Sequence, residues 1–222
     1  MSLFITFEGI EGSGKTTQIK ILDDILKLRG YETVLTREPG GTAIGDQIRT
    51  ILLDSENTGI LPLCELFLYA SARAQHVQQV IEPALAAKKI VLCDRFTDAT
   101  LAYQGYGRDF SLEMISAINH LAVGKLKPGL TFLMDCDPEI GLRRARERIA
   151  TQVQKSSEDR FENEAFPFHE RVREGYLAIA RAEPERVIIV NANPDVEAVH
   201  QEIVKNVSNA LHWPPKKLGT AP

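Results

Sequence analysis

The chain contains, at positions 9–17, the run Gly9-Ile10-Glu11-Gly12-Ser13-Gly14-Lys15-Thr16-Thr17, which matches the pattern G-x-x-x-x-G-K-[ST]. An apolar, β-forming run, Leu3-Phe4-Ile5-Thr6-Phe7, comes directly before it, and a helix-like run at 17–29 follows. In this strand–loop–helix setting the pattern is typical of a phosphate-binding loop, or P-loop. The alternative is a glycine-rich turn that matches by chance, and the flanking strand and helix argue against it.

The loop residues predict how a nucleotide would be held. Glycines allow a tight turn that points several N–H groups into one concavity, and the following helix adds the positive end of its dipole. Lys15 places a charge on the β- and γ-phosphates, and the Thr16 hydroxyl is a ligand for Mg²⁺. We therefore expect residues 9–17 to bind the phosphates of a nucleotide.

Length and charge narrow the class of protein. The chain has 222 residues, which favours one domain, with two small ones as the alternative. We expect this domain to span 1–212, and we expect the tail at 213–222, which is rich in Pro and Lys, to be poorly ordered. The net charge of −4 gives no electrostatic footprint for nucleic acid. Phosphate binding must then come from a local basic pocket.

Cysteine usage and hydropathy predict the compartment. Cys64, Cys93 and Cys136 are scattered and form no C-x-x-C pair, which favours reduced thiols in the cytoplasm over disulfides. Cys93 and Cys136 lie in apolar runs and are expected to fill the core. No segment approaches 18 consecutive apolar residues, and no charged start precedes the first strand. We expect neither a membrane span nor a signal peptide.

Strand-like and helix-like segments alternate along the chain. Beyond the first strand, continuous apolar or β-branched runs predict strands at 32–36, 89–94, 131–135 and 187–190. Helices are predicted at 44–53, 61–88, 99–104, 112–123, 138–148, 161–181 and 196–211, with Pro83 kinking or splitting the second of these. Apolar strands alternating with helices are typical of an α/β fold, here a parallel five-stranded sheet with helices on both faces.

Ligands of such sheets lie beyond the carboxyl ends of the strands, where several charged residues fall. Asp94 ends a predicted strand and could hold Mg²⁺ across from Thr16, while Arg95 offers a planar fork for a second phosphate. Arg37 ends another strand and precedes Glu38-Pro39-Gly40-Gly41. The alternatives are a structural ion pair for Asp94 and Arg95 and an exposed turn residue for Arg37.

Two groups of residues on predicted helices suit a planar base. Tyr69 and Arg73 are four residues apart and share a helix face, so a ring and a guanidinium could contact one base. Thr100 and the pair Tyr103-Gln104 follow the strand that ends at Asp94 and could contact a base edge and a sugar. A core tyrosine beside a surface arginine, and ordinary helix polarity, remain the alternatives.

A basic segment leads into a polar stretch at 150–160. It carries Arg143, Arg144, Arg146 and Arg148, and Arg160 follows the stretch. Arginines on a mobile lid, here about 143–160, could close over transferring phosphates and stabilise developing charge. We expect Arg148 and Arg160, at the two ends, to act in this way, against the alternative of a solvated helix face.

Several motifs together resemble those of the thymidylate kinases, specifically the bacterial form. They occur in order along nearly the whole chain, and the third is highly specific: Phe7-Glu8-Gly9, the P-loop, Thr36-Arg37-Glu38-Pro39-Gly40-Gly41-Thr42, Ala72-Arg73-Ala74-Gln75-His76, Asp94-Arg95-Phe96, Ala102-Tyr103-Gln104-Gly105 and Asp159-Arg160-Phe161-Glu162. The resemblance implies transfer of the γ-phosphoryl group of ATP to dTMP, with Mg²⁺, by a protein that is typically a homodimer.

The resemblance also implies roles for the candidate residues. Arg37 and Arg95 would grip the dTMP phosphate, Arg73 and Thr100 would read thymine, and Tyr103 would exclude a ribose 2′-hydroxyl. Gln104 would lie against the base, Glu11 near the sugar, and Lys15 and the lid arginines would act on the transferring group. The chain departs from the family where Tyr69 replaces the usual Phe and where residues 149–158 lengthen the lid.

Other functions remain open at this stage. The nearest is a kinase of another pyrimidine nucleotide or of a deoxynucleoside. A nucleotide-gated switch would carry an N-K-x-D guanine signature, and the chain has none. A binding module without catalysis is disfavoured by Lys15, Asp94 and the arginine-rich segment.

Overall fold

The computed structural model describes residues 2–151 and 160–213. Five parallel strands form one sheet in the order β2-β3-β1-β4-β5. The strands are β1 (Leu3–Glu8), β2 (Thr33–Arg37), β3 (Ile90–Asp94), β4 (Leu130–Asp135) and β5 (Val187–Asn191). The predicted five-stranded parallel sheet is therefore confirmed, with each strand within about two residues of its expected place.

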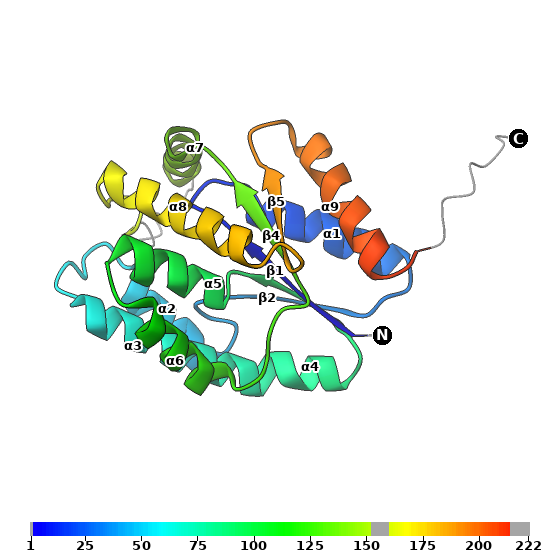
Figure 1. Ribbon diagram of the computed structural model, residues 1–222, viewed down its shortest axis with the longest axis horizontal. Coiled ribbons are helices and arrows are strands. Elements are labelled where there is room, and N and C mark those ends of the chain that lie inside the picture. Colours follow the sequence, from blue (N-terminus) through cyan, green and yellow to red (C-terminus); the bar gives the residue numbers. More distant parts are fainter. Residues whose placement is uncertain (1, 152–159, 214–222) are drawn as a thin grey trace, which may run out of the picture.

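Helices cover both faces of this sheet (Figure 1). Helix α1 (Lys15–Leu28) and helix α9 (Val196–Ala210) pack together on one face. On the other face lie α4 (Glu82–Ala86), α5 (Thr97–Thr100), the π-helical segment η2 (Leu101–Gly107) and α8 (Phe166–Ala182). Beyond them lie α2 (Ala43–Leu53), α3 (Pro62–His76) and α6 (Leu112–Val123).

Four helix boundaries differ from the prediction. The helix expected at 99–104 is instead the short α5 followed by the π-helical η2, which ends at Gly107. The long helix expected at 61–88 is split into α3, a π-helical turn η1 (Val77–Ile81) and α4, with Pro83 in the first turn of α4. Helix α7 (Pro138–Thr151) continues past Arg148, so it includes the first two residues of the polar stretch at 150–160. Helix α8 begins at Phe166 rather than at Phe161, because Pro167 suits a first helical turn and residues 160–163 form a turn.

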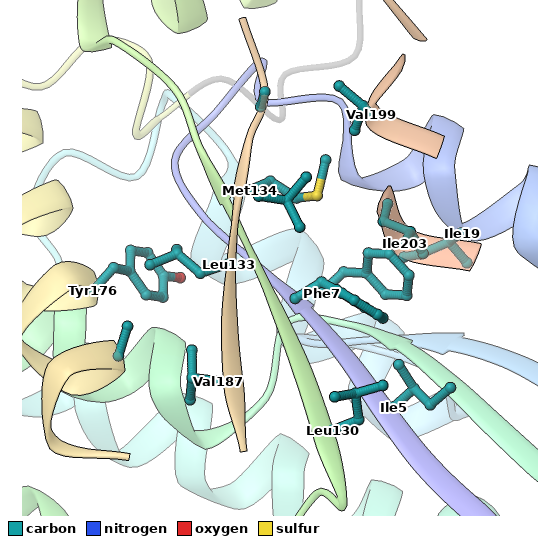
Figure 2. Packing of buried hydrophobic residues seen from close by; sticks show 14 of the residues in the cluster. Ile5, Phe7, Ile19, Leu130, Leu133, Met134, Tyr176, Val187, Val199 and Ile203 are labelled. Atoms are coloured by element: carbon teal, nitrogen blue, oxygen red, sulfur yellow. The ribbon is translucent and has the colours of Figure 1, made fainter. Parts of the chain in front are cut away.

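The core lies between the sheet and the helices of each face. Alternate residues of one strand serve the two faces, because successive side chains of a strand point in opposite directions. In Figure 2, Leu133 of β4 points toward Tyr176 of α8, while Met134 lies with Phe7 on the side of Ile19 and Ile203. These strands have apolar neighbours on both faces, which explains their continuous apolar sequences.

The described part of the chain ends at Trp213, the first residue of the predicted tail. Trp213, assigned to the tail, instead packs on the body: its Nε1–H donates to Tyr31 Oη at 3.1 Å, and the Arg29 guanidinium lies 3.9 Å from its ring centroid. Residues 152–159 of the predicted lid and 214–222 of the predicted tail lie outside the described residues. Cys93 and Cys136 are buried as predicted. Within the described ranges, no helix is long and apolar enough to cross a membrane.

Candidate active site

The phosphate-binding loop runs from the end of β1 to Lys15, the first residue of α1 (Figure 1). Gly14 precedes the helix with φ 88°, in the left-handed region that favours glycine. Gly12 also has positive φ, 68°, and a Cβ added there would lie 1.9 Å from the Gly141 carbonyl oxygen of α7. The loop therefore packs directly on α7.

Lys15 lies inside this loop and is buried. Its Nζ donates to the carbonyl oxygens of Gly9 at 3.0 Å and Ile10 at 2.8 Å and to Ser13 Oγ at 3.2 Å. Burial, and then the neighbouring Arg95 guanidinium, lower the pKa of Lys15 to about 8. The ammonium group thus lies in the concavity that the loop forms, as the motif predicts.

The predicted metal ligands are neighbours. Thr16 Oγ1 donates to Asp94 Oδ2 at 2.8 Å, which places a hydroxyl and a carboxylate oxygen together at the mouth of the loop. Hard oxygen ligands of this kind suit Mg²⁺. In the part of the chain that the structure describes, no group of three or more His, Cys, Asp or Glu side chains could hold a metal ion.

Arg95 connects the loop to the opposite wall of the site. Its guanidinium donates to Tyr176 Oη at 3.0 Å, Glu11 Oε1 at 2.9 Å and Tyr103 Oη at 3.0 Å. Its backbone φ of 69° is unusual for a non-glycine residue. The Arg95 side chain therefore leaves the end of β3 beside Asp94 and points toward the loop, where it contacts Glu11.

Glu11 is the acid that this arginine pairs with. Its Oε1 also accepts from Tyr103 Oη at 2.5 Å, and its Oε2 lies 3.5 Å from Nδ1 of the buried His169. Burial alone would raise the pKa of Glu11, but Arg95, His169 and Lys15 outweigh it and hold that pKa well below its usual range. Glu11 is thus an anion that fixes both the Arg95 fork and the Tyr103 hydroxyl.

Glu8 belongs to the Phe7-Glu8-Gly9 motif, but the sequence did not indicate it as a site residue. It is linked to Arg95 through the Tyr176 hydroxyl. It is 1% exposed, accepts from the Phe96 backbone N–H at 2.7 Å and accepts from Tyr176 Oη at 2.8 Å. Burial, and then the nearby Asp98, raise the pKa of Glu8 to about 7. A hydrogen-bonded chain therefore runs from Arg95 through Tyr176 to Glu8.

Arg73 is held by a buried network rather than by solvent. It is 2% exposed, and its Nε donates to Glu38 Oε2 at 2.7 Å. One terminal nitrogen donates to Thr100 Oγ1 and Asn119 Oδ1, both at 2.8 Å, and the other to the Phe96 carbonyl oxygen at 3.0 Å. Since a guanidinium has five N–H groups, one remains on the second terminal nitrogen. Arg73 also lines the cavity beside Thr100, as predicted.

Tyr69, Tyr103 and Gln104 form the rest of the predicted base site, and all three line the cavity. Phe161, which follows Arg160, joins them: its ring centroid lies 5.4 Å from that of Tyr103, edge to face, and 6.5 Å from that of Tyr69. Burial, and then the carboxylate of Glu65, raise the pKa of Tyr69. Phe161 was missed as a lining residue because its motif was interpreted only through the neighbouring arginine.

The predicted arginines lie in different surroundings. Arg37 is half exposed at the end of β2, 3.9 Å from Asp46 Oδ1, and lines the cavity. Arg148 also lines the cavity, is 56% exposed, and lies 3.5 Å from Glu162 Oε1. Arg160 instead donates to Glu65 Oε2 at 2.7 Å and to the Leu52 carbonyl oxygen at 2.5 Å. Arg144 was not predicted to be a site residue, but it lines the cavity and donates to the Ala192 and Asn193 carbonyl oxygens.

A single cavity of about 1350 Å³ joins these parts. It is lined by the loop, by the start of α9 and by the rings around Tyr69. Arg95 also lines it and bonds both Glu11 of the loop and Tyr103 beside the rings. Of the described residues predicted for the site, Gly9, Ile10 and Arg160 lie outside its lining. A cavity of this size has room for two nucleotides.

A phosphate-binding loop on a five-stranded parallel sheet, facing a basic cavity with a ring-lined end, defines the class: the protein is an ATP-dependent nucleoside-monophosphate kinase. A sequence model of the thymidylate kinase family matches residues 7–203. The chain therefore belongs to the thymidylate kinase family.

Individual relatives agree with this placement. A thymidylate kinase from Pelobacter propionicus is 57% identical, over 93% of this chain and 94% of its own length. One from Geobacter sulfurreducens is 54% identical, over 95% and 99%. The crystal structure of thymidylate kinase from Ehrlichia chaffeensis is similar with a TM-score of 0.72 and 36% identity, covering 93% of this chain and 98% of that one.

Proposed function

We propose that the protein transfers the γ-phosphoryl group of ATP to dTMP, giving ADP and dTDP. The observation that carries this proposal is the single cavity with the P-loop at one end, the rings of Tyr69 and Phe161 at the other, and Arg95 between them. Membership of the thymidylate kinase family supports the same reaction. A phosphate oxygen of dTMP would attack the γ-phosphorus, and the bond to the oxygen that bridges the β- and γ-phosphorus atoms would break.

Phosphoryl transfer needs little covalent chemistry from a protein, so positioning and charge do most of the catalysis. The loop amides and Lys15 are proposed to hold the donor phosphates. Arg95 and Arg148, which both line the cavity, are proposed to stabilise charge on the transferring group. The lowered pKa of Lys15 leaves the ammonium charged near neutral pH, and the nearby anions Asp94 and Glu11 favour that form.

The acceptor is proposed to lie on the side of Arg37 and Arg95, with its phosphate between their guanidinium groups. Tyr103 Oη is held by Glu11 and Arg95, so a fixed hydroxyl would crowd a ribose 2′-hydroxyl. The remaining N–H of Arg73, together with Thr100 and Gln104, would face the thymine edge. Tyr69 would stack on the base.

The oxygens of Thr16 and Asp94 fit Mg²⁺, and we propose that they hold this ion with the ATP phosphates. Mg²⁺ would neutralise charge on the β- and γ-phosphate oxygens when bound.

We further propose that each chain forms one domain, which includes Trp213, and works in the cytoplasm as a homodimer. Large apolar side chains of α2 and α3 support the dimer, because Ile44, Ile51, Leu63 and Phe67 are each about half exposed on neighbouring helices. Exposed apolar patches of this kind mark protein interfaces.

The test is ADP release with ATP and Mg²⁺ across dTMP, dUMP, dCMP and thymidine. We expect kcat/KM to be largest for dTMP, with turnover that depends on added acceptor. A preference for dCMP or thymidine would instead favour a kinase of another pyrimidine nucleotide or of a deoxynucleoside. ADP release without any acceptor would contradict the kinase assignment.

A further inference from the structure

Glu65 of α3 is a buried carboxylate that collects hydrogen bonds from two other parts of the chain. It is 1% exposed. Its Oε1 accepts from Gln104 Nε2 at 2.8 Å, and its Oε2 accepts from Arg160 at 2.7 Å. Arg108 adds two longer contacts, at 3.4 and 3.3 Å. A buried acid with two guanidinium groups beside it is a strong geometric constraint, because each partner left alone would be an uncompensated charge.

Arg160 is fixed on both sides of its guanidinium. Its Nε donates to the Leu52 carbonyl oxygen at the end of α2, and its backbone N–H donates to the Leu53 carbonyl oxygen at 3.2 Å. The guanidinium carbon lies 4.6 Å from the centroid of the Phe161 ring. With a side chain only 11% exposed, Arg160 is oriented toward α2 and α3 and away from the loop that would hold ATP.

This pair contacts three groups that line the acceptor end of the cavity. Gln104 has its amide held by Glu65 directly. Tyr69 follows Glu65 by one helical turn and shares its face of α3. Phe161 is covalently next to Arg160, and its ring contacts the rings of both Tyr69 and Tyr103.

We propose that Glu65 and Arg160 are positioning residues for the acceptor-base pocket, and that Arg160 does not act on the transferring phosphoryl group. The proposal rests on the proposed phosphorylation of dTMP. It separates the two arginines that the sequence grouped together: Arg148 lines the cavity and is largely exposed, whereas Arg160 is committed to a buried carboxylate. Glu65 gives no sequence signal of this role, since its partners are 39 and 95 residues away.

The experiment compares Glu65→Gln, Arg160→Met and the double variant by steady-state kinetics, varying dTMP and ATP separately. Each single change is expected to raise KM for dTMP by about tenfold, with kcat and KM for ATP within about threefold of wild type. The double variant is expected to be no worse than the poorer single variant, because one interaction is lost in all three. Thermal unfolding of each variant confirms that the assayed protein is folded.

Two further variants serve as controls for these changes in kcat and KM. Arg148→Met is expected to lower kcat by at least about a hundredfold, as for a group that stabilises transition-state charge. Arg173→Met breaks a bidentate pair with Asp135, at 2.7 and 2.9 Å, that lies outside the cavity lining. It should leave both KM values within about twofold of wild type even if stability falls.

The proposal fails if Arg160→Met lowers kcat as Arg148→Met does while KM for dTMP stays at the wild-type value. It also fails if both variants lose thermal stability alone and neither KM changes, because the pair would then be merely structural. Should Arg160→Met not fold, Arg160→Lys keeps the charge but not the fork. A rise of about threefold in KM for dTMP is expected there, and no rise would count against the proposal. Wild-type protein that does not phosphorylate dTMP would overturn the proposed function as well, which distinguishes the two failures.

Discussion

The phosphate-binding loop and the acceptor-base pocket share one cavity but are built in opposite ways. The loop is nine consecutive residues, and the ammonium group of Lys15 donates its hydrogen bonds within the loop. The pocket is assembled from side chains of β2, α3, α5, η2 and the segment after residue 160, joined by buried charges such as Arg73 and Glu65. We therefore expect chemistry at the loop to be separable from folding, and recognition in the pocket to be coupled to it.

Lys15→Ala gives the largest expected effect and tests this separation. We expect kcat to fall by about a thousandfold, since one positioned charge on the phosphates is lost. Affinity for dTMP, measured by calorimetry, should stay within about threefold, because the pocket does not depend on Lys15. Near-normal turnover would contradict the role of the loop.

The same variant should not lose stability. The folded-state pKa of Lys15, about 8, lies below the ordinary 10.5, so burying the charged form opposes folding near neutral pH. The denaturation midpoint of Lys15→Ala at pH 7 is expected to equal or exceed that of wild type.

Arg73→Ala is expected to show the opposite behaviour. Removing the guanidinium takes a buried donor from Glu38, Thr100 and Asn119 and leaves Glu38 its contact with His76. This change should cost about 3 kcal/mol in the free energy of unfolding. KM for dTMP should rise together with this loss, while KM for ATP changes little. If base preference and dTMP affinity remain at wild-type values, Arg73 does not contact thymine.

Gly12→Ala breaks the loop through its backbone. The added Cβ would meet the Gly141 carbonyl oxygen at 1.9 Å, and the φ of 68° is unfavourable for alanine. We expect a loss of about 2 kcal/mol in urea unfolding, together with weaker ATP binding. Gly59→Ala is the matched control, because a Cβ there meets no atom within 4 Å. A Gly12→Ala protein as stable as this control would contradict the close contact with α7.

Glu8 lies where the two regions join, and its effect on stability depends on pH. Its folded-state pKa of about 7 exceeds the ordinary 4.5, so between these values the folded protein binds more protons than the unfolded chain. Stability should therefore fall as pH rises from 4.5 to 7. Glu8→Gln should remove a slope of at most about 1.4 kcal/mol per pH unit in this window, measured by urea unfolding at several pH values. Equal slopes in the two proteins would mean that Glu8 does not titrate there.

The contrast between a contiguous loop and a pocket assembled from distant segments explains what could be predicted from the sequence. The P-loop and the five strands are local patterns, so periodicity and spacing were sufficient, and Thr16 and Asp94 meet because β1 and β3 are neighbours. Residues 161–165 were wrongly assigned to a helix, because an apolar residue such as Phe161 fits a helical pattern as well as it fits a buried turn. Glu65 and Glu8 were missed as site residues, since a single acid carries no local signal and its partners are distant in sequence.

The contact between Gly12 and Gly141 limits how the loop and α7 can move relative to each other. Gly12 and Gly141 face each other so closely that either Cβ would strike the opposite backbone, Gly141 meeting the Glu11 carbonyl oxygen at 2.5 Å. A Cβ at Gly141 would also lie 3.0 Å from Cδ1 of Ile10, and packed interiors compress little. A displacement of the loop by incoming phosphates would therefore push α7 as a rigid rod, and Arg144 and Arg148, which α7 carries, would move with it. The absence of a side chain at Gly12 and Gly141 thus predicts that binding of the donor shifts these two arginines.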